Sequence, residues 1–171
     1  MLLSLIPFVS LPPAASAASL TLDMEPSGVT YSSVSFSLTI HEAPNYVEAF
    51  GIEIRFDPNI LSFEGYEKGE LVKQFLMEGA SNPASDLVVV AGLSDTGISE
   101  GASGELAKLT FRVITPCVAT DLRFTTLFDD IQGWDTEDGT LDPPPSCAWF
   151  DAPIVFGEGS GYGLCFVGTL F

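Results

Sequence analysis

Residues 34–40, VSFSLTI, alternate apolar and polar side chains at every position. Successive side chains of a β-strand point to opposite faces, so this pattern predicts a strand with one buried and one solvated face. The same period recurs in YVEAFGIEIRF at 46–56. The side chains predicted to point inward there are Phe50, Ile52, Ile54 and Phe56. Those predicted to point outward are Gly51, Glu53 and Arg55.

Similar runs predict further strands at 19–25, 60–66, 86–93, 104–114 and 120–128. The run at 86–93 is apolar on both faces, as expected for a central strand or for one covered by a partner. Only residues 68–80 have helical spacing, which predicts one or two turns. Turn signals separate the runs, and they include Pro26-Ser27-Gly28, Asp57-Pro58-Asn59, Asn82-Pro83, Gly97, Gly101 to Gly104 and Thr115-Pro116. The chain is therefore predicted to be all-β, an antiparallel β-sandwich of about eight or nine strands.

The charge of the chain is strongly one-sided, with 23 acidic and 6 basic residues and a net charge of −17. Nucleic acids and anionic membranes attract basic surfaces, so both are excluded as partners by this balance. Such a charge favours solubility outside the cell and suits divalent cations or a basic partner.

Both ends of the chain differ in composition from its middle. Residues 1–17 are predicted to be a secretory signal peptide, with an apolar stretch and cleavage after Ala17; the alternative is a buried first strand. The apolar stretch is too short for a membrane span, so none is predicted in the mature chain. Residues 18–142 are the predicted sandwich, 143–156 a Pro-rich packing or linker segment, and 157–171 a Gly-rich apolar tail. The protein is thus expected to be secreted or displayed on a cell surface.

The three cysteines fit an oxidising compartment. Cys117 and Cys147 are candidates for one disulfide, with two buried free thiols as the alternative. Cys165 lies in the tail, which either packs as a last strand or is a C-terminal processing segment with Cys165 as the processing point.

The order of several short motifs resembles the cohesin family and related bacterial carbohydrate-binding modules. A first strand ends near EPSGV, and a long strand ends in Phe56-Asp57-Pro58. Next come Leu61-Ser62-Phe63, the Gly69-Glu70 turn and a late strand from Gly104 to Phe111. The resemblance covers about residues 19–140. Taken alone, these residues have structural roles: Asp57-Pro58-Asn59 is turn chemistry, and the phenylalanines fill a core.

The resemblance implies a jelly-roll sandwich that is not an enzyme. Cohesins bind dockerin modules, whose loops hold calcium, and so assemble polysaccharide-degrading enzymes on a scaffold or cell surface. The implied docking surface is the outer face of one sheet that includes the strands at 46–56 and 104–114. The candidate partner-binding residues are Glu53, Arg55, Lys108, Thr110 and Arg112. The alternative for these side chains is solvated cross-strand ion pairing.

Other functions rest on weaker patterns. The acidic stretch 129–142 offers candidate calcium ligands without EF-hand spacing, namely Asp129, Asp130, Asp135, Glu137 and Asp138. Trp134 and Trp149, with Tyr31, Tyr46 or Tyr66, are candidates for a sugar-stacking platform, which makes a carbohydrate-binding module the second functional hypothesis. A structural cell-surface protein is the third. His41, the single histidine, has no recognisable nucleophile motif around it, so catalysis is not predicted.

Overall fold

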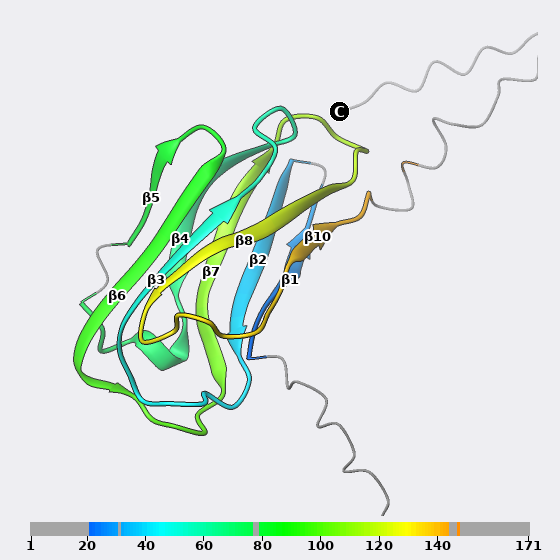
Figure 1. Cartoon of the computed structure of the whole chain (residues 1–171). Helices are drawn as coiled ribbons and strands as arrows, with labels where there is room; N and C mark the ends of the chain where they lie inside the picture. The colour runs from blue at the N-terminus through cyan, green and yellow to red at the C-terminus, as the bar shows by residue number, and fades with distance from the viewer. Residues whose placement is uncertain (1–20, 31, 77–78, 144–146, 148–171) are drawn as a thin grey trace, which may run out of the picture.

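The protein is a sandwich of two five-stranded sheets, seen in a computed structural model of the chain (Figure 1). The structure describes residues 21–30, 32–76, 79–143 and 147. One sheet has the order β4-β7-β2-β1-β9, and the other has the order β10-β8-β3-β6-β5. All pairings are antiparallel except the short parallel contact of β1 with β9. The all-β antiparallel sandwich predicted from the sequence is confirmed.

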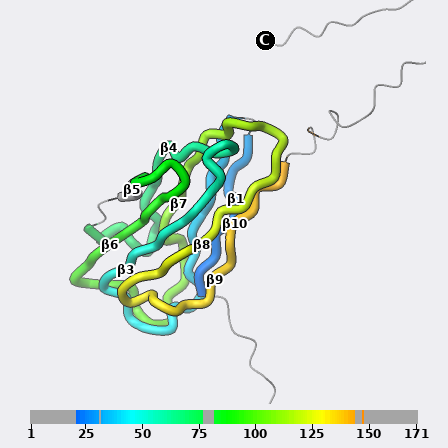
Figure 2. The backbone as a smooth tube through the Cα atoms, turned by 45° about the horizontal axis from the view of Figure 1, so that its top comes forward, coloured from blue at the N-terminus to red at the C-terminus, as the bar shows by residue number. Residues whose placement is uncertain are grey.

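The strands follow one another along the chain with one short helical turn among them. The elements are β1 (Leu22–Val29), β2 (Ser33–Ile40), β3 (Val47–Arg55), β4 (Leu61–Lys68), the 3₁₀ turn η1 (Glu70–Val72), β5 (Gly79–Ala84), β6 (Leu87–Ile98), β7 (Gly104–Val113), β8 (Thr120–Asp129), β9 (Thr136–Glu137) and β10 (Gly139–Leu141). The tube in Figure 2 shows how β9 and β10 complete the two sheets beside β1 and β8. Within the described residues, no helix is long and apolar enough to cross a membrane.

The core lies between the two sheets and is built from the predicted inward rows. Phe50, Ile52, Ile54 and Phe56 are all buried, as are Phe36 and Leu38 of β2. The ring of Phe111 on β7 lies at the centre of an aromatic cluster. Its centroid is 6.1 Å from that of Phe36, 5.2 Å from that of Phe56 and 5.5 Å from that of Phe63, with edge-to-face geometry in each pair.

Three predicted turns instead lie inside strands. Pro26-Ser27-Gly28 is part of β1, where the register shifts against β2. The other neighbour, β9, pairs only with Leu22 and Asp23, so no described strand pairs with β1 on that side at Pro26. The missing backbone N–H of proline is tolerated at such an edge. Asn82-Pro83 lies in β5, an edge strand whose pairing with β6 is interrupted at these two residues. Gly97 lies in β6 with a φ of +58°.

Other local predictions agree with the structure. Asp57 Oδ1 accepts a hydrogen bond of 2.8 Å from the backbone N–H of Asn59, which closes the predicted turn between β3 and β4. The segment 68–80 contains one helical turn, η1, and then passes into β5. The sandwich itself runs from Leu22 to Leu141.

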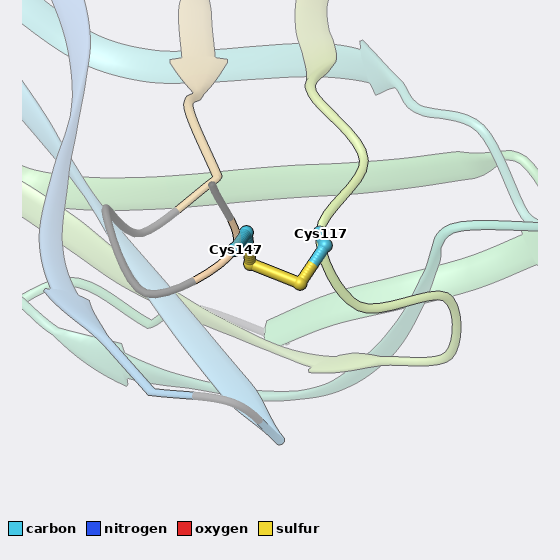
Figure 3. Close-up of a disulfide and its surroundings, with 2 residues drawn as sticks. All are labelled: Cys117 and Cys147. Atoms are coloured by element: carbon cyan, nitrogen blue, oxygen red, sulfur yellow. A yellow bond between two sulfur atoms is a disulfide. The ribbon is translucent and has the colours of Figure 1, made fainter. Parts of the chain in front are cut away.

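A disulfide joins Cys117, in the loop after β7, to Cys147, which follows β10 (Figure 3). The two Cα atoms are 5.3 Å apart and 30 residues apart in sequence. The bond therefore ties the last described residue of the chain to the loop that leads into β8. The predicted cleavage site at Ala17, the segments outside 21–147 and Cys165 lie outside the described residues.

Candidate functional site

The five side chains predicted to bind a partner are divided between two opposite faces. Glu53 and Arg55 lie on β3, whereas Lys108, Thr110 and Arg112 lie on β7. These strands belong to different sheets, so the expectation of one shared outer face is wrong. The physical reason is the core itself. Both strands direct their apolar rows into the same space between the sheets, which forces their polar rows in opposite directions.

The outer face of β7 is polar. Thr110 Oγ1 and Ser35 Oγ are 3.3 Å apart across the β7–β2 pair. Arg112 Nε lies 3.7 Å from Glu64 Oε1 of β4, an exposed ion pair that contributes little to stability. Lys108 pairs in register with Ser37 and Glu67, and no ion pair of its side chain occurs among the described residues.

On the opposite face, Glu53 and Arg55 are each held by a neighbouring strand or loop. Thr126 Oγ1 donates a 2.9 Å hydrogen bond to Glu53 Oε2. Arg55 Nη1 lies 2.5 Å from Asp86 Oδ2, and Arg55 is in register with Arg123 of β8. Arg123 in turn lies 3.1 Å from Asp121. Both arginines at this end of the sheet therefore already have a carboxylate partner.

The other end of the same face is apolar, and no described element covers it. Leu76, Leu93 and Phe128 are 75%, 57% and 42% exposed. Register places Leu93 of β6 beside Ala49 of β3, and it places Phe128 of β8 beside Gly51. The backbone N–H of Leu76 donates a 2.8 Å hydrogen bond to the carbonyl oxygen of Leu93, which fixes Leu76 next to the sheet. We call Leu76, Leu93 and Phe128 the apolar patch.

Gly51 explains how Phe128 is held in this patch. Gly51 was expected to face solvent, yet it is buried, because the Phe128 side chain lies over it. A Cβ atom at Gly51 would be 3.2 Å from Cδ2 and 3.3 Å from Cβ of Phe128. The missing side chain therefore allows the aromatic ring to lie close to β3.

Sequence reasoning missed the apolar patch as a site, although its signal was present. The run 86–93 is apolar on both faces, and only its inward residues Val88 and Val90 are needed for the core. The outward residues of the same strand, Leu87, Val89, Ala91 and Leu93, have no layer of protein over them among the described elements. An apolar row on the outer face of a two-layer sandwich favours an interaction surface.

Two of the five acidic residues proposed as calcium ligands hold backbone groups of neighbouring strands. Asp130 Oδ2 accepts hydrogen bonds from the backbone N–H groups of Glu48 and Ala49, at 2.8 and 2.9 Å, and these two bonds lower the pKa of Asp130. Asp138 Oδ1 accepts a 2.8 Å bond from the backbone N–H of Phe124. Over the described part of the chain, no three acidic, histidine or cysteine side chains gather as a metal site, including Asp129, Asp135 and Glu137. The carboxylates of Asp130 and Asp138 thus fasten loops to strands.

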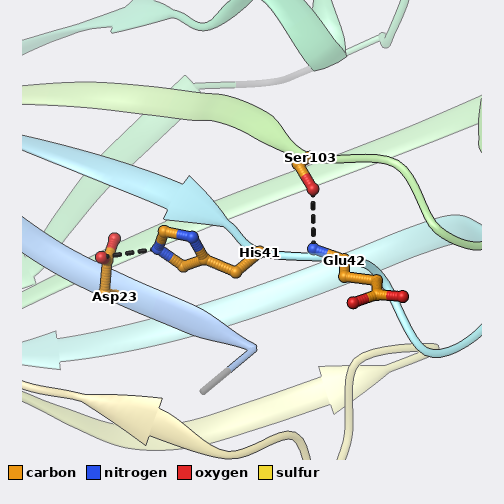
Figure 4. Close-up of polar contacts among 4 residues, drawn as sticks. All are labelled: Asp23, His41, Glu42 and Ser103. Atoms are coloured by element: carbon orange, nitrogen blue, oxygen red, sulfur yellow. Dashed lines mark hydrogen bonds and ion pairs between the residues drawn. The ribbon is translucent and has the colours of Figure 1, made fainter. Parts of the chain in front are cut away.

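The single histidine belongs to a structural pair. His41 Nε2 lies 2.7 Å from Oδ2 of the buried Asp23 (Figure 4). Ser103 Oγ lies nearby but accepts its 2.8 Å hydrogen bond from the backbone N–H of Glu42. This arrangement holds the end of β2 against the Gly101–Gly104 loop and does not pair the imidazole with a nucleophile.

Two of the aromatic side chains proposed for a sugar-stacking platform pack against the core. Trp134 packs against the core, and its Nε1 donates a 3.0 Å hydrogen bond to Asn45 Oδ1. Tyr66 also packs against the core, whereas Tyr46 is exposed. Tyr31 and Trp149 lie outside the described residues. These contacts give Trp134 and Tyr66 packing roles.

The described part of the chain is thus a two-layer antiparallel β-sandwich, and one end of one sheet face carries exposed apolar side chains. Comparison with solved structures defines the fold more closely: it is the cohesin fold. The seventh ScaB type I cohesin of Pseudobacteroides cellulosolvens is similar with a TM-score of 0.58 and 14% identity, over 74% of this chain and 94% of that one. A non-cellulosomal cohesin of the archaeon Archaeoglobus fulgidus has a TM-score of 0.56 and 18% identity, over 77% and 97%.

A third similar structure is the third ScaC cohesin of Acetivibrio cellulolyticus, solved in complex with the ScaB dockerin. Its TM-score is 0.60 at 18% identity, over 73% of this chain and 99% of that one. No protein-family model matches the sequence, and no curated protein matches it either. The resemblance to cohesins noted in the sequence is therefore confirmed at the level of the fold.

Proposed function

We propose that this protein is an extracellular, non-catalytic binding module that docks a dockerin-type protein partner on the outer face of β8, β3 and β6. The observation that carries the proposal is the apolar patch of Leu76, Leu93 and Phe128. Three large apolar side chains on one solvated sheet face are costly to leave in water, and a protein partner that covers them gains the hydrophobic free energy.

Several similar structures support the class of partner. The ScaC cohesin of A. cellulolyticus and a cohesin of Clostridium thermocellum were each solved as complexes with a dockerin. An extracellular location is supported by the disulfide and by the N-terminal segment that reads as a signal peptide. A link to polysaccharide degradation would follow if the dockerin-bearing partners are hydrolases.

The proposal assigns different roles to the five residues predicted from the sequence. Glu53 and Arg55 lie on the docking face, on the same strand as Gly51 but toward the other end from the apolar patch, and are proposed to contribute polar contacts at the rim. Lys108, Thr110 and Arg112 lie on the opposite sheet and are proposed to remain outside the interface.

The test is a binding array of the dockerin modules encoded by the source organism, measured by calorimetry in calcium and in EDTA. We expect at least one dockerin to bind in calcium and to lose binding in EDTA. Leu93→Asp should weaken this binding at least thirtyfold, because it buries a charge at the centre of the contact; an interface hot spot typically contributes 2 kcal/mol or more.

The matched control is Lys108→Asp, which also introduces an aspartate on a solvated strand face, but on the opposite sheet. It should leave the dissociation constant within about twofold. Absence of binding by every dockerin would overturn the proposed function. If Lys108→Asp lost binding and Leu93→Asp kept it, the docking face would instead lie on the β7 sheet.

A further inference from the structure

The apolar patch is hollowed on both sides of the Leu76–Leu93 pair. One hollow, of about 300 Å³, is lined mainly by Ala49, Ala91 and the two leucines, with Asp129 at its edge. The other, of about 580 Å³, is lined by Gln74, Ser94, Asp95 and the same two leucines. Both leucines therefore line both hollows, and the lining of each hollow also includes one aspartate.

These two aspartates are free to meet a cation. Neither Asp95 nor Asp129 has a side-chain hydrogen bond or ion pair within the described residues, and both are exposed. No basic side chain lines either hollow. The arginines of this face, Arg55 and Arg123, lie toward the other end of β3 and β8, and each already has an aspartate partner.

We infer that the two hollows select a partner whose apolar contact residues are flanked by lysine or arginine. The inference rests on the proposed docking face and specifies the chemistry of the partner that fits it. Apolar side chains of the partner lie against Leu76 and Leu93, and its cations reach Asp95 and Asp129. A partner with carboxylates at these positions meets unpaired like charge on a protein whose net charge is −17, and it is rejected.

The test uses synthetic helical peptides, so that it does not depend on finding a dockerin. The first peptide carries two leucines one helical turn apart, flanked by lysines. The second has glutamate in place of each lysine, and the third keeps the lysines but has alanine in place of each leucine. Backbone amide shifts of the ¹⁵N-labelled protein are followed during titration with each peptide.

We expect the leucine–lysine peptide to shift the amides of Gly92, Leu93 and Phe128 in a saturable way. The other two peptides should bind at least tenfold more weakly. Equal binding by the glutamate peptide would overturn the charge selection. Equal binding by the alanine peptide, or shifts spread evenly over the acidic surface, would show that net charge alone attracts the lysines and would also overturn the inference.

Two double variants with the same net charge separate local from global electrostatics. Asp95→Asn with Asp129→Asn should weaken binding of the leucine–lysine peptide at least threefold. Glu25→Gln with Glu67→Gln removes two charges from the opposite sheet and should change it less than 1.5-fold. Equal effects of the two pairs would contradict the inference.

A second copy of the chain is the competing occupant of the patch, and sedimentation of the free protein tests for it. A dimer that dissociates in Leu93→Asp would replace the inference with self-association. Failure of every dockerin to bind would reject the proposed partner class. The inference would still be tested separately, because the peptide titration measures binding at the hollows directly.

Discussion

The imidazole of His41 is the hydrogen-bond partner of a carboxylate that has almost no contact with water. Asp23 is 7% exposed, its Oδ2 lies 2.7 Å from His41 Nε2, and its Oδ1 has no hydrogen-bond partner among the described residues. A buried polar atom without a partner is costly, and one of the two oxygens of Asp23 already bears that cost. The contact with His41 gives the other oxygen, Oδ2, its hydrogen-bond partner.

We predict that His41→Ala lowers the free energy of unfolding by about 1 kcal/mol, because it removes the hydrogen bond to Asp23 Oδ2 at a half-exposed position. Urea denaturation followed by fluorescence measures the change. His41→Gln is the matched control, since its amide N–H group can still donate, and it should lose less than His41→Ala. Equal losses would show that packing of the ring, rather than the hydrogen bond, is what matters.

Asp130 is predicted to make stability depend on pH in the acid range. Its bonds to the backbone N–H groups of Glu48 and Ala49 hold its pKa below the ordinary value of 3.8. A carboxyl group with a lowered pKa in the folded state stabilises that state above the unfolded pKa, and the stabilisation is lost as the pH falls through the folded pKa. Asp130→Asn should therefore be less stable than wild type at pH 7, and the difference should shrink below about pH 4.

The control for this prediction is Asp129→Asn, a neighbouring change that removes one charge but neither backbone bond. Asp129 has a φ of +59°, which asparagine adopts readily. Urea denaturation of both variants at pH 7, 5 and 3 makes the comparison. A difference between wild type and Asp130→Asn that stays constant over this range would contradict the assignment.

Removal of the disulfide by Cys117→Ser with Cys147→Ser is predicted to lower the free energy of unfolding by about 3–4 kcal/mol. The bond joins residues that are 30 positions apart. Closing a loop of that size lowers the entropy of the unfolded chain, which corresponds to about 3–4 kcal/mol of stability at 25 °C. Chemical denaturation with and without a reducing agent gives the measurement. The reducing agent should destabilise the wild type and leave the double variant unchanged.

Two glycines near the end of β4 should respond very differently to alanine. A Cβ atom at Gly69 would overlap the backbone carbonyl of Glu105, and Gly69 N–H donates a 3.0 Å bond to the carbonyl of Leu106. Gly65 has no atom within 4 Å of the corresponding position. We expect Gly69→Ala to cost at least about 2 kcal/mol, and Gly65→Ala to change stability by less than about 1 kcal/mol. Thermal denaturation of both variants measures the two changes in stability, and equal changes would contradict the prediction.

The fold could be predicted from the sequence because its core rows keep a strict period of two. Phe36 and Leu38 on one strand and Ile52 and Ile54 on another are all fully buried, as alternation requires. The two-residue strand β9 and the three-residue strand β10 could not be found, because so short a segment has no period. Their positions depend on pairing with β1 and β8, which is a tertiary contact.

The candidate site was harder to predict than the fold. Alternation tells which side chains of one strand share a face, but it does not tell which sheet that strand joins. Glu53 and Lys108 therefore looked like neighbours in the sequence argument although their strands lie in opposite layers. Leu93 and Phe128 come from runs that read as core, and only the sheet order reveals that nothing among the described elements covers them.

The parallel contact of β9 with the start of β1 has a practical consequence for any protein fused to this one. It places the beginning of β1 at one end of the sandwich, and β10 then runs toward the opposite end, where it meets the start of β8 (Figure 1). The start of β1 and the end of β10 therefore lie at opposite ends of the sandwich. The apolar patch lies on a sheet face between these two ends, so a domain joined at either end would attach away from it.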